Sequence, residues 1–303
     1  MMKIAEFYDE IQRFLPDLEI YTNEPMAKHT SFRIGGPAAV MAFPKNANEL
    51  SKLLNLSVLM DIKVAILGAG TNVLAPDEGM DCLVICLKDC MGGMERLDDT
   101  HIRIAAGVTM TRAALFAASL GLSGLEFAHG IPGTVGGGIY MNAGAYGGEI
   151  CQVCSETDVM DKKGKIRTLL AKEMDFSYRH SLLEETGEIV LSGVFALTPA
   201  PEEEIRAHMH ELMKKRSASQ PLDLPSAGSA FKRPVGGYAA ALIDQAGLRG
   251  FQIGGAAISR KHAGFAVNLG GATACDVKKL LSEVSDIVFE KSGIRLEPEV
   301  RVW

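Results

Sequence analysis

The sequence predicts an α+β fold that contains α/β elements, and three observations lead to this prediction. Strand, helix and strand patterns alternate over residues 38–44, 46–61 and 63–70. Two β-rich segments joined by a Lys-Lys-Gly turn predict a hairpin over 156–170. A start rich in proline and glutamate and a basic end predict a helix over 198–216 that marks a domain boundary.

The other elements follow from hydrophobic periodicity. Before the boundary we expect helices over 4–14 and 110–120 and strands near 82–87, 101–106 and 188–197. After it we expect a loop over 226–237, a helix over 238–246, two short strands, a helix over 275–291 and a terminal strand over 294–303. Two helices carry clear apolar faces: Leu50, Leu53, Leu54 and Val58 on the first, and Val277, Leu280, Leu281, Val284, Ile287 and Val288 on the second.

Composition narrows the classes of function. The chain has 303 residues and a net charge of −6, with no basic stripe, so we expect no nucleic-acid partner. Neither a bilayer-spanning apolar run nor the apolar core of a signal peptide is present, so we expect a cytoplasmic protein without a membrane partner. We also expect a monomer.

Six cysteines raise the question of a metal or redox site. The spacing of Cys151 and Cys154 is that of half a zinc site or of a dithiol, but it has no second pair and no nearby group of histidines. We therefore expect reduced structural thiols and no metal.

Two glycine-rich stretches carry few side chains able to do acid–base chemistry: "LGAGTN" (67–72) and "GIPGTVGGGIYMNAGAYGGE" (130–149). The first lacks the third glycine of a dinucleotide fingerprint, and Pro76 and Gly79 argue against a helix after it. A single glycine-rich stretch is more typical of tight loops. Two of them favour a cradle in which backbone N–H groups bind a phosphorylated cofactor.

Three other segments are unremarkable by composition: "SYRHS" (177–181), "SAGSAFKRP" (226–234) and "LEPEVR" (296–301). A lone arginine is usually a solvated charge, and Ser229 reads first as a turn residue. Glu297 and Glu299 share one face of the expected terminal strand.

These segments, in this order, resemble the UDP-N-acetylenolpyruvoylglucosamine reductases, and the resemblance runs from about residue 23 to "LEPEVR". It implies an FAD-binding fold of the vanillyl-alcohol-oxidase-like type in two subdomains, over 1–80 and 81–200, and a substrate domain over 201–303. The implied FAD-binding residues are Gly68, Ala69, Gly70, Thr71, Asn72, Gly130, Ile131, Pro132, Gly133, Thr134, Gly136, Gly137, Asn142, Ala143, Gly144 and Ala145.

The resemblance also implies an oxidoreductase that uses FAD and NADPH to reduce a CH–CH group of UDP-N-acetylglucosamine enolpyruvate, a small-molecule substrate. Arg179 would meet the negative charge that develops on the carboxylate. Ser229 would donate a proton to the neighbouring carbon, and Glu299 would donate a hydrogen bond while protonated. The implied substrate-binding residues are Tyr178, Arg216 and Lys232.

The chain departs from the family pattern at two places. Arg233 stands where many members have asparagine, and an inserted tyrosine-bearing loop is missing, as in the shorter subgroup. A related flavin oxidase and a non-catalytic nucleotide-binding module remain as alternative interpretations. His129, beside the second glycine stretch, leaves covalent flavin attachment open.

Overall fold

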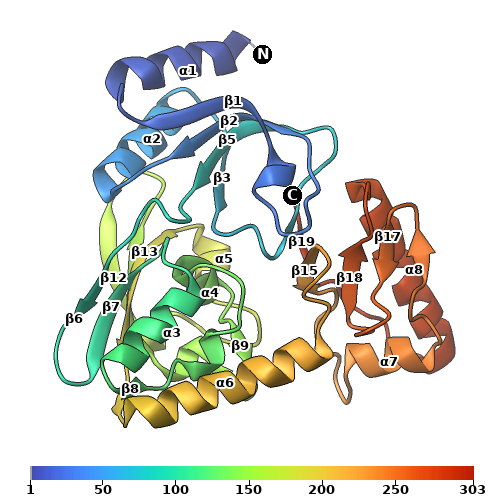
Figure 1. Cartoon of the computed structure of the whole chain (residues 1–303). Coiled ribbons are helices and arrows are strands. Elements are labelled where there is room, and N and C mark those ends of the chain that lie inside the picture. Colours follow the sequence, from blue (N-terminus) through green and yellow to red (C-terminus); the bar gives the residue numbers. More distant parts are fainter. Residues whose placement is uncertain (1) are drawn as a thin grey trace. The chain divides into compact units, whose positions relative to one another are not determined.

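The computed structural model describes residues 2–303, which form two compact units (Figure 1). Unit 1 comprises the chain up to Thr22, Ala39–Ala69 and Asp81–Lys215, and unit 2 comprises Asn23–Ala38, Gly70–Met80 and Arg216–Trp303. Both units are discontinuous in sequence. The division of the chain at residues 80 and 200 stays a prediction.

The first sheet of unit 1 has the strand order β1 (Glu19–Pro25), β2 (Pro37–Phe43), β5 (Met80–Cys86) and β3 (Val64–Leu67). Its β3 and β5 are parallel. Helices α1 (Met2–Phe14) and α2 (Ala47–Leu59) contribute Phe7 and Leu50 to a core that includes Leu83. The expected helix face was wrong at Val58, which is 56% exposed, whereas Ser57 is buried.

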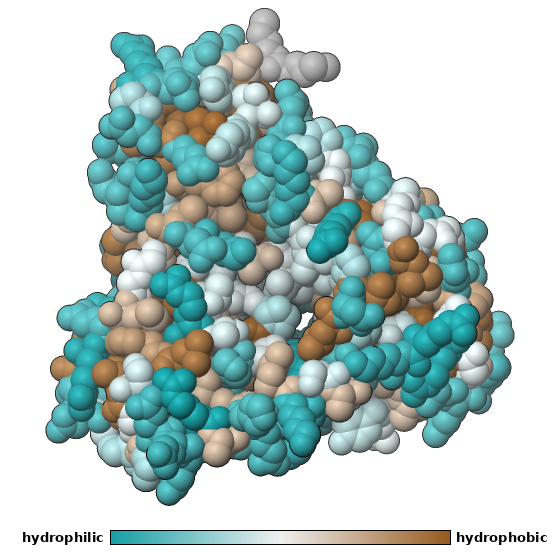
Figure 2. Space-filling model, viewed as in Figure 1, coloured by the Kyte–Doolittle hydropathy of each residue, from teal (hydrophilic) through white to brown (hydrophobic). Residues whose placement is uncertain are grey.

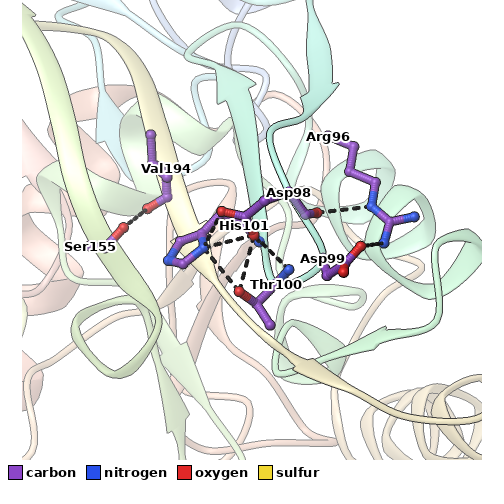
Figure 3. Close-up of polar contacts among 7 residues, drawn as sticks. All are labelled: Arg96, Asp98, Asp99, Thr100, His101, Ser155 and Val194. Atoms are coloured by element: carbon purple, nitrogen blue, oxygen red, sulfur yellow. Dashed lines mark hydrogen bonds and ion pairs between the residues drawn. The ribbon is translucent and has the colours of Figure 1, made fainter.

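The second sheet is antiparallel, in the order β12 (Ile166–Leu170), β11 (Cys154–Met160), β13 (Ile189–Ala196), β7 (His101–Ala105) and β6 (Met94–Arg96). The register Glu156↔Leu170 confirms the predicted hairpin. Figure 3 shows two details of this sheet, the Asp98 turn between β6 and β7 and a hydrogen bond from Ser155 Oγ to the carbonyl of Val194.

Helices complete unit 1. The helix α3 (Met110–Ser119) and the short helix α4 (Val135–Tyr140) contribute to the core of this sheet, and α4 packs against β13. The helix α6 (Glu202–Ser219) contributes Ile205 and Met209 to the same core. The shorter elements are α5 (Leu183–Thr186) and the strand pairs β8 (Leu122–Ser123) with β14 (Thr198–Pro199) and β9 (Gly144–Ala145) with β10 (Gly148–Glu149).

The helix α4 was not expected, because its sequence VGGGIY contains three glycines, and each weakens a helix by roughly 1 kcal/mol relative to alanine. Close packing explains it. A Cβ at Gly136 would lie 2.9 Å from Ala106 Cβ, and one at Gly138 would lie 2.8 Å from Met110 Sδ. Thr134 caps the helix, since its Oγ1 accepts a hydrogen bond from the Gly137 N–H at 3.3 Å.

Unit 2 contains a sheet in the order β15 (Ser226–Ser229), β18 (Phe265–Asn268), β17 (Ala256–Ile258) and β16 (Gln252–Ile253). Helices α7 (Ala239–Gln245) and α8 (Ala274–Ser292) supply its core. The predicted stripe of α8 is buried except at Ile287, which is half-buried.

The predicted terminal strand over 294–303 is reduced to β19 (Arg301–Val302), which pairs in parallel with β4 (Val73–Leu74). Before it, the described residues of the tail form only an isolated antiparallel bridge between Pro298 and Phe231. The face drawn in Figure 2 is mainly hydrophilic, with apolar patches on both units. Among the described helices, none has the length and apolar composition required to cross a membrane.

Candidate flavin and substrate site

The first glycine loop directly follows β3. Within residues 2–303, the backbone N–H groups of Gly68 and Ala69 donate to no protein acceptor. A Cβ at Gly68 would lie only 2.6 Å from Thr134 Oγ1, so in unit 1 this loop lies against the second glycine stretch. Two adjacent N–H groups without a protein acceptor are what an anionic diphosphate requires.

The loop then enters unit 2. Gly70 has the left-handed φ of 63° and accepts a hydrogen bond from the Ser31 N–H at 2.9 Å. The next residue is Thr71, and the carbonyl of Asn72 accepts from the Arg301 N–H at 3.0 Å. The end of the first glycine loop is thus hydrogen-bonded to the C-terminal strand of unit 2.

Packing within the protein requires some glycines of the second stretch and not others. Four of them allow close packing within the protein, and a Cβ would come within 3 Å of a neighbouring atom at each: Gly136, Gly138, Gly144 and Gly148. By contrast, a Cβ at Gly137 would have its nearest contact at 3.6 Å, and one at Gly147 would meet nothing within 4 Å. Part of this glycine content is therefore explained without a ligand.

The backbone N–H groups of residues 135–138 all donate to protein acceptors. A diphosphate at this stretch would therefore be met by the residues before α4. These are Gly130, Ile131, Pro132, Gly133 and Thr134. Pro132 has no N–H and the Ile131 N–H donates to the Ala128 carbonyl at 3.1 Å, which leaves the N–H groups of Gly130, Gly133 and Thr134 without a protein acceptor within residues 2–303. The residues present thus fit a diphosphate at the junction of this segment with Gly68 and Ala69.

Asn142 holds the second part of the stretch together. Its side chain is only 1% exposed, and its Nδ2 donates to the Ser177 carbonyl at 3.0 Å and to Glu149 Oε2 at 3.2 Å. Its Oδ1 accepts from the Cys151 N–H at 2.9 Å. The next residue, Ala143, donates its N–H to the Gly138 carbonyl at 2.8 Å. Sequence reasoning did not find this role, although an asparagine beside glycines is a signal for a left-handed residue, and its φ is 42°.

Arg179 lies at the tip of a tight turn in unit 1. Ser177 and His180 exchange two backbone hydrogen bonds of 3.2 Å, and Arg179 has the left-handed φ of 57°. Its Nη2 donates to the Gly144 carbonyl at 3.1 Å, and its guanidinium carbon lies 5.1 Å from the ring centroid of Tyr178. The guanidinium is thus positioned by the glycine stretch that includes Gly144 and Ala145.

Ser229 and Glu299 lie on neighbouring segments of unit 2. Ser229 ends β15 after a bulge at Gly228, whose φ is 78°, and its side chain is exposed. The Glu299 N–H donates to the carbonyl of Ala230 at 2.9 Å. The structure therefore brings the two predicted residues of unit 2 together, while Arg179 belongs to unit 1.

The predicted substrate cations have protein contacts of their own. Lys232 forms an ion pair with Glu297, and Arg216 is half-buried on α6. Arg233, the departure from the family pattern, lies with its guanidinium carbon 4.5 Å from the ring centroid of Tyr238.

The cysteines are free thiols, and His129 lines a cavity. All six cysteines are free thiols, and burial raises the pKa of Cys154 to about 11, which makes it unreactive. The His129 ring lines a cavity of about 210 Å³ between α3 and α6, with Leu115, Arg206, Met209, His210 and Met213, and burial lowers its pKa.

The chain is similar to known proteins over nearly its whole length. Residues 37–170 match the family described as FAD binding domain, and residues 220–303 match UDP-N-acetylenolpyruvoylglucosamine reductase, C-terminal domain. The UDP-N-acetylenolpyruvoylglucosamine reductase of Agathobacter rectalis is 46% identical over 98% of this chain and 98% of its own length. That of Levilactobacillus brevis is 44% identical over 97% of this chain and 96% of its own.

A solved structure is similar over nearly the same length. The crystal structure of UDP-N-acetylenolpyruvylglucosamine reductase from Thermus caldophilus has a TM-score of 0.80 and 35% sequence identity. It covers 94% of this chain and 98% of its own.

Proposed function

Because the chain belongs to the UDP-N-acetylenolpyruvoylglucosamine reductase family, we propose that it reduces the enolpyruvyl group of UDP-N-acetylglucosamine enolpyruvate to UDP-N-acetylmuramate with NADPH. The observation that carries this proposal is the match at 46% identity over 98% of the chain. The chain has a vanillyl-alcohol-oxidase-like fold with an FAD-binding domain, which is consistent with a flavin-dependent reductase. The reaction belongs to peptidoglycan precursor synthesis, and we place the protein in the cytoplasm as a monomer.

The cofactor supplies the redox chemistry. A bound FAD would supply the hydride-transfer chemistry that saturates the enolpyruvyl double bond, and NADPH would supply the electrons. The protein's part is to bind the diphosphate with Gly68, Ala69 and the segment Gly130–Thr134, where the fit described above supports it. Ala143, Gly144 and Ala145 complete the proposed FAD contacts.

Arg179 stabilises the anionic intermediate. Hydride addition places negative charge on the substrate carboxylate, and a planar guanidinium meets it with two parallel hydrogen bonds. The turn conformation and the bond to Gly144 fix this guanidinium in advance, so little reorganisation is required at the moment of reaction.

Ser229 and Glu299 complete the reduction. Ser229 gives its hydroxyl proton to the carbon next to the new C–H bond, and its exposure leaves it accessible. Glu299, protonated, donates a hydrogen bond to the same intermediate. Tyr178, Arg216 and Lys232 bind the substrate. Lys232 can do so only after its ion pair with Glu297 breaks.

Ser229→Ala separates the two half-reactions. We expect NADPH to bleach the bound flavin at the wild-type rate, while turnover of the UDP-sugar falls by roughly 10²–10³. Ser226→Ala, in the same strand, is the matched control and should keep full turnover. Unchanged turnover in Ser229→Ala would show that this serine is not the proton donor.

Glu299→Gln and Glu299→Ala test the protonation state. Glutamine retains a neutral hydrogen-bond donor, whereas alanine removes it, so we expect turnover to fall in the order wild type, glutamine, alanine. Steady-state rates with the UDP-sugar make the comparison. A glutamine variant as inactive as the alanine variant would mean that Glu299 acts as a carboxylate.

A further inference from the structure

Three side chains with metal-ligating atoms converge beside the Arg179 turn: Asp175, His180 and Glu185. One ligand atom from each lies within 4.8 Å of the other two. Asp175 precedes the turn, His180 closes it and Glu185 lies on α5, so the three come from separate parts of a short segment. A tetrahedral ion with bonds of about 2.0–2.2 Å places its ligands roughly 3.3–3.6 Å apart, so the three side chains would close by up to about 1 Å. The side chains of Asp175 and Glu185 are exposed and can make this adjustment by rotation.

Backbone hydrogen bonds order the segment that carries Asp175 and His180. The Leu182 N–H donates to the Met174 carbonyl at 2.7 Å, and this hydrogen bond closes a loop around the turn. Inside it, Ser177 and His180 exchange their two hydrogen bonds. Asp175 has a φ of 44°, a conformation that aspartate and asparagine tolerate better than most residues. Asp175 and His180 therefore lie within one closed loop, and Glu185 follows it on α5.

The histidine has the surroundings of a metal ligand. Its Nε2 lies 3.6 Å from Glu185 Oε1, close to the separation of about 3.3–3.4 Å between two ligands of a tetrahedral zinc ion. Its Nδ1 lies 3.4 Å from Glu184 Oε2. A carboxylate on the second ring nitrogen fixes the tautomer and the ring orientation, as is usual for metal-bound histidine.

The local charge favours a cation. Four carboxylates, those of Glu173, Asp175, Glu184 and Glu185, stand within thirteen residues that carry one full positive charge, that of Arg179. One imidazole and two carboxylates suit zinc or manganese, whereas magnesium and calcium prefer oxygen ligands alone.

We propose that Asp175, His180 and Glu185 bind a divalent transition-metal ion, with water in its remaining positions and Glu184 orienting His180. This proposal does not depend on the proposed reductase activity. His180 directly follows Arg179, so a bound ion would restrain the turn that presents the guanidinium.

Manganese binding tests the site. Tag-free, flavin-loaded protein is titrated with Mn²⁺, and the free ion is measured by its electron paramagnetic resonance signal. Manganese is a hard ion that disfavours thiolates, so the free cysteines compete little. We expect one ion per chain, weakened at least tenfold in Asp175→Asn, His180→Gln and Glu185→Gln. His208→Gln, an exposed histidine on α6, is the matched control and should bind as the wild type does.

Zinc provides a second arm, followed by calorimetry with Cys275→Ser beside His180→Gln, because Cys275 is an exposed thiol. We expect zinc binding to survive Cys275→Ser and to be lost in His180→Gln. Thermal unfolding verifies that each variant is folded. The proposal is overturned if no manganese binds, if the three variants bind as the wild type does, or if zinc binding depends on Cys275 in place of His180.

Discussion

Asn142 is a residue whose importance only the structure shows. It is buried, it has a left-handed backbone, and its amide links the glycine stretch to the segment that carries Arg179. Sequence reasoning placed it among the FAD-binding residues, and that prediction stands untested. Its side chain, however, is engaged with Glu149, Cys151 and Ser177, so any flavin contact would use its backbone.

Asn142→Ala should lower the free energy of unfolding by about 3 kcal/mol, because three hydrogen bonds to buried or half-buried partners are lost. Urea unfolding measures the change. Asn48→Ala, an exposed asparagine on α2, is the control and should alter stability by less than about 0.5 kcal/mol. A loss in Asn142→Ala no larger than that of the control would contradict the role given to this amide.

Asp98 is the second residue with a specific prediction. Its carboxylate accepts hydrogen bonds from the Thr100 N–H at 2.7 Å, the His101 N–H at 2.8 Å and His101 Nδ1 at 3.0 Å (Figure 3). The Thr100 backbone bond and the His101 side chain hold the pKa of Asp98 well below its usual value of 3.8. The charged carboxylate therefore stabilises the folded state above that value, and the stabilisation is lost as the pH falls below it.

Asp98→Asn should flatten the acid limb of the stability profile. Between about pH 5 and pH 2, the free energy of unfolding should fall less in the variant than in the wild type, because asparagine does not titrate. Asp99→Asn, an exposed neighbour in the same turn, should follow the wild-type profile. Parallel profiles for Asp98→Asn and the wild type would refute the assignment.

Among the elements, α4 is the one that sequence reasoning missed and that matters most. Helix propensity argues against VGGGIY, but Ala106 and Met110 leave no room for side chains at Gly136 and Gly138. Tertiary packing thus overrides local propensity. The tail over 294–303 was only partly correct as a strand, because the structure pairs just Arg301–Val302 with β4 and forms a single bridge between Pro298 and Phe231.

A pair of glycine substitutions tests this explanation. Gly136→Ala should lower the free energy of unfolding by about 1–3 kcal/mol, because its Cβ would press against Ala106. Gly137→Ala meets only an ordinary contact and should raise stability by up to about 1 kcal/mol. Both are compared with the wild type at equal flavin occupancy. Stabilisation by Gly136→Ala would mean that packing does not require this glycine.

At the scale of the whole molecule, the sequence predicted the individual elements better than their assembly. Periodicity correctly located α1, α2, α3, α8 and the 156–170 hairpin. It could not foresee that 23–38 and 70–80 belong with the C-terminal unit, because pairings such as β4 with β19 join residues more than two hundred positions apart. The residues of the candidate site were equally hard to predict from local sequence. No local pattern distinguishes Arg179, Ser229 and Glu299 from ordinary surface residues, and only the family resemblance selected them.

The central claim is that this chain uses FAD to pass electrons from NADPH to an enolpyruvyl UDP-sugar. Its most direct test is an anaerobic double-mixing experiment that follows flavin absorbance. The account predicts that NADPH bleaches the bound flavin and that UDP-N-acetylglucosamine enolpyruvate then restores its colour with formation of UDP-N-acetylmuramate. A folded protein that carries no flavin, or a reduced flavin that only oxygen and not the UDP-sugar reoxidises, would contradict it.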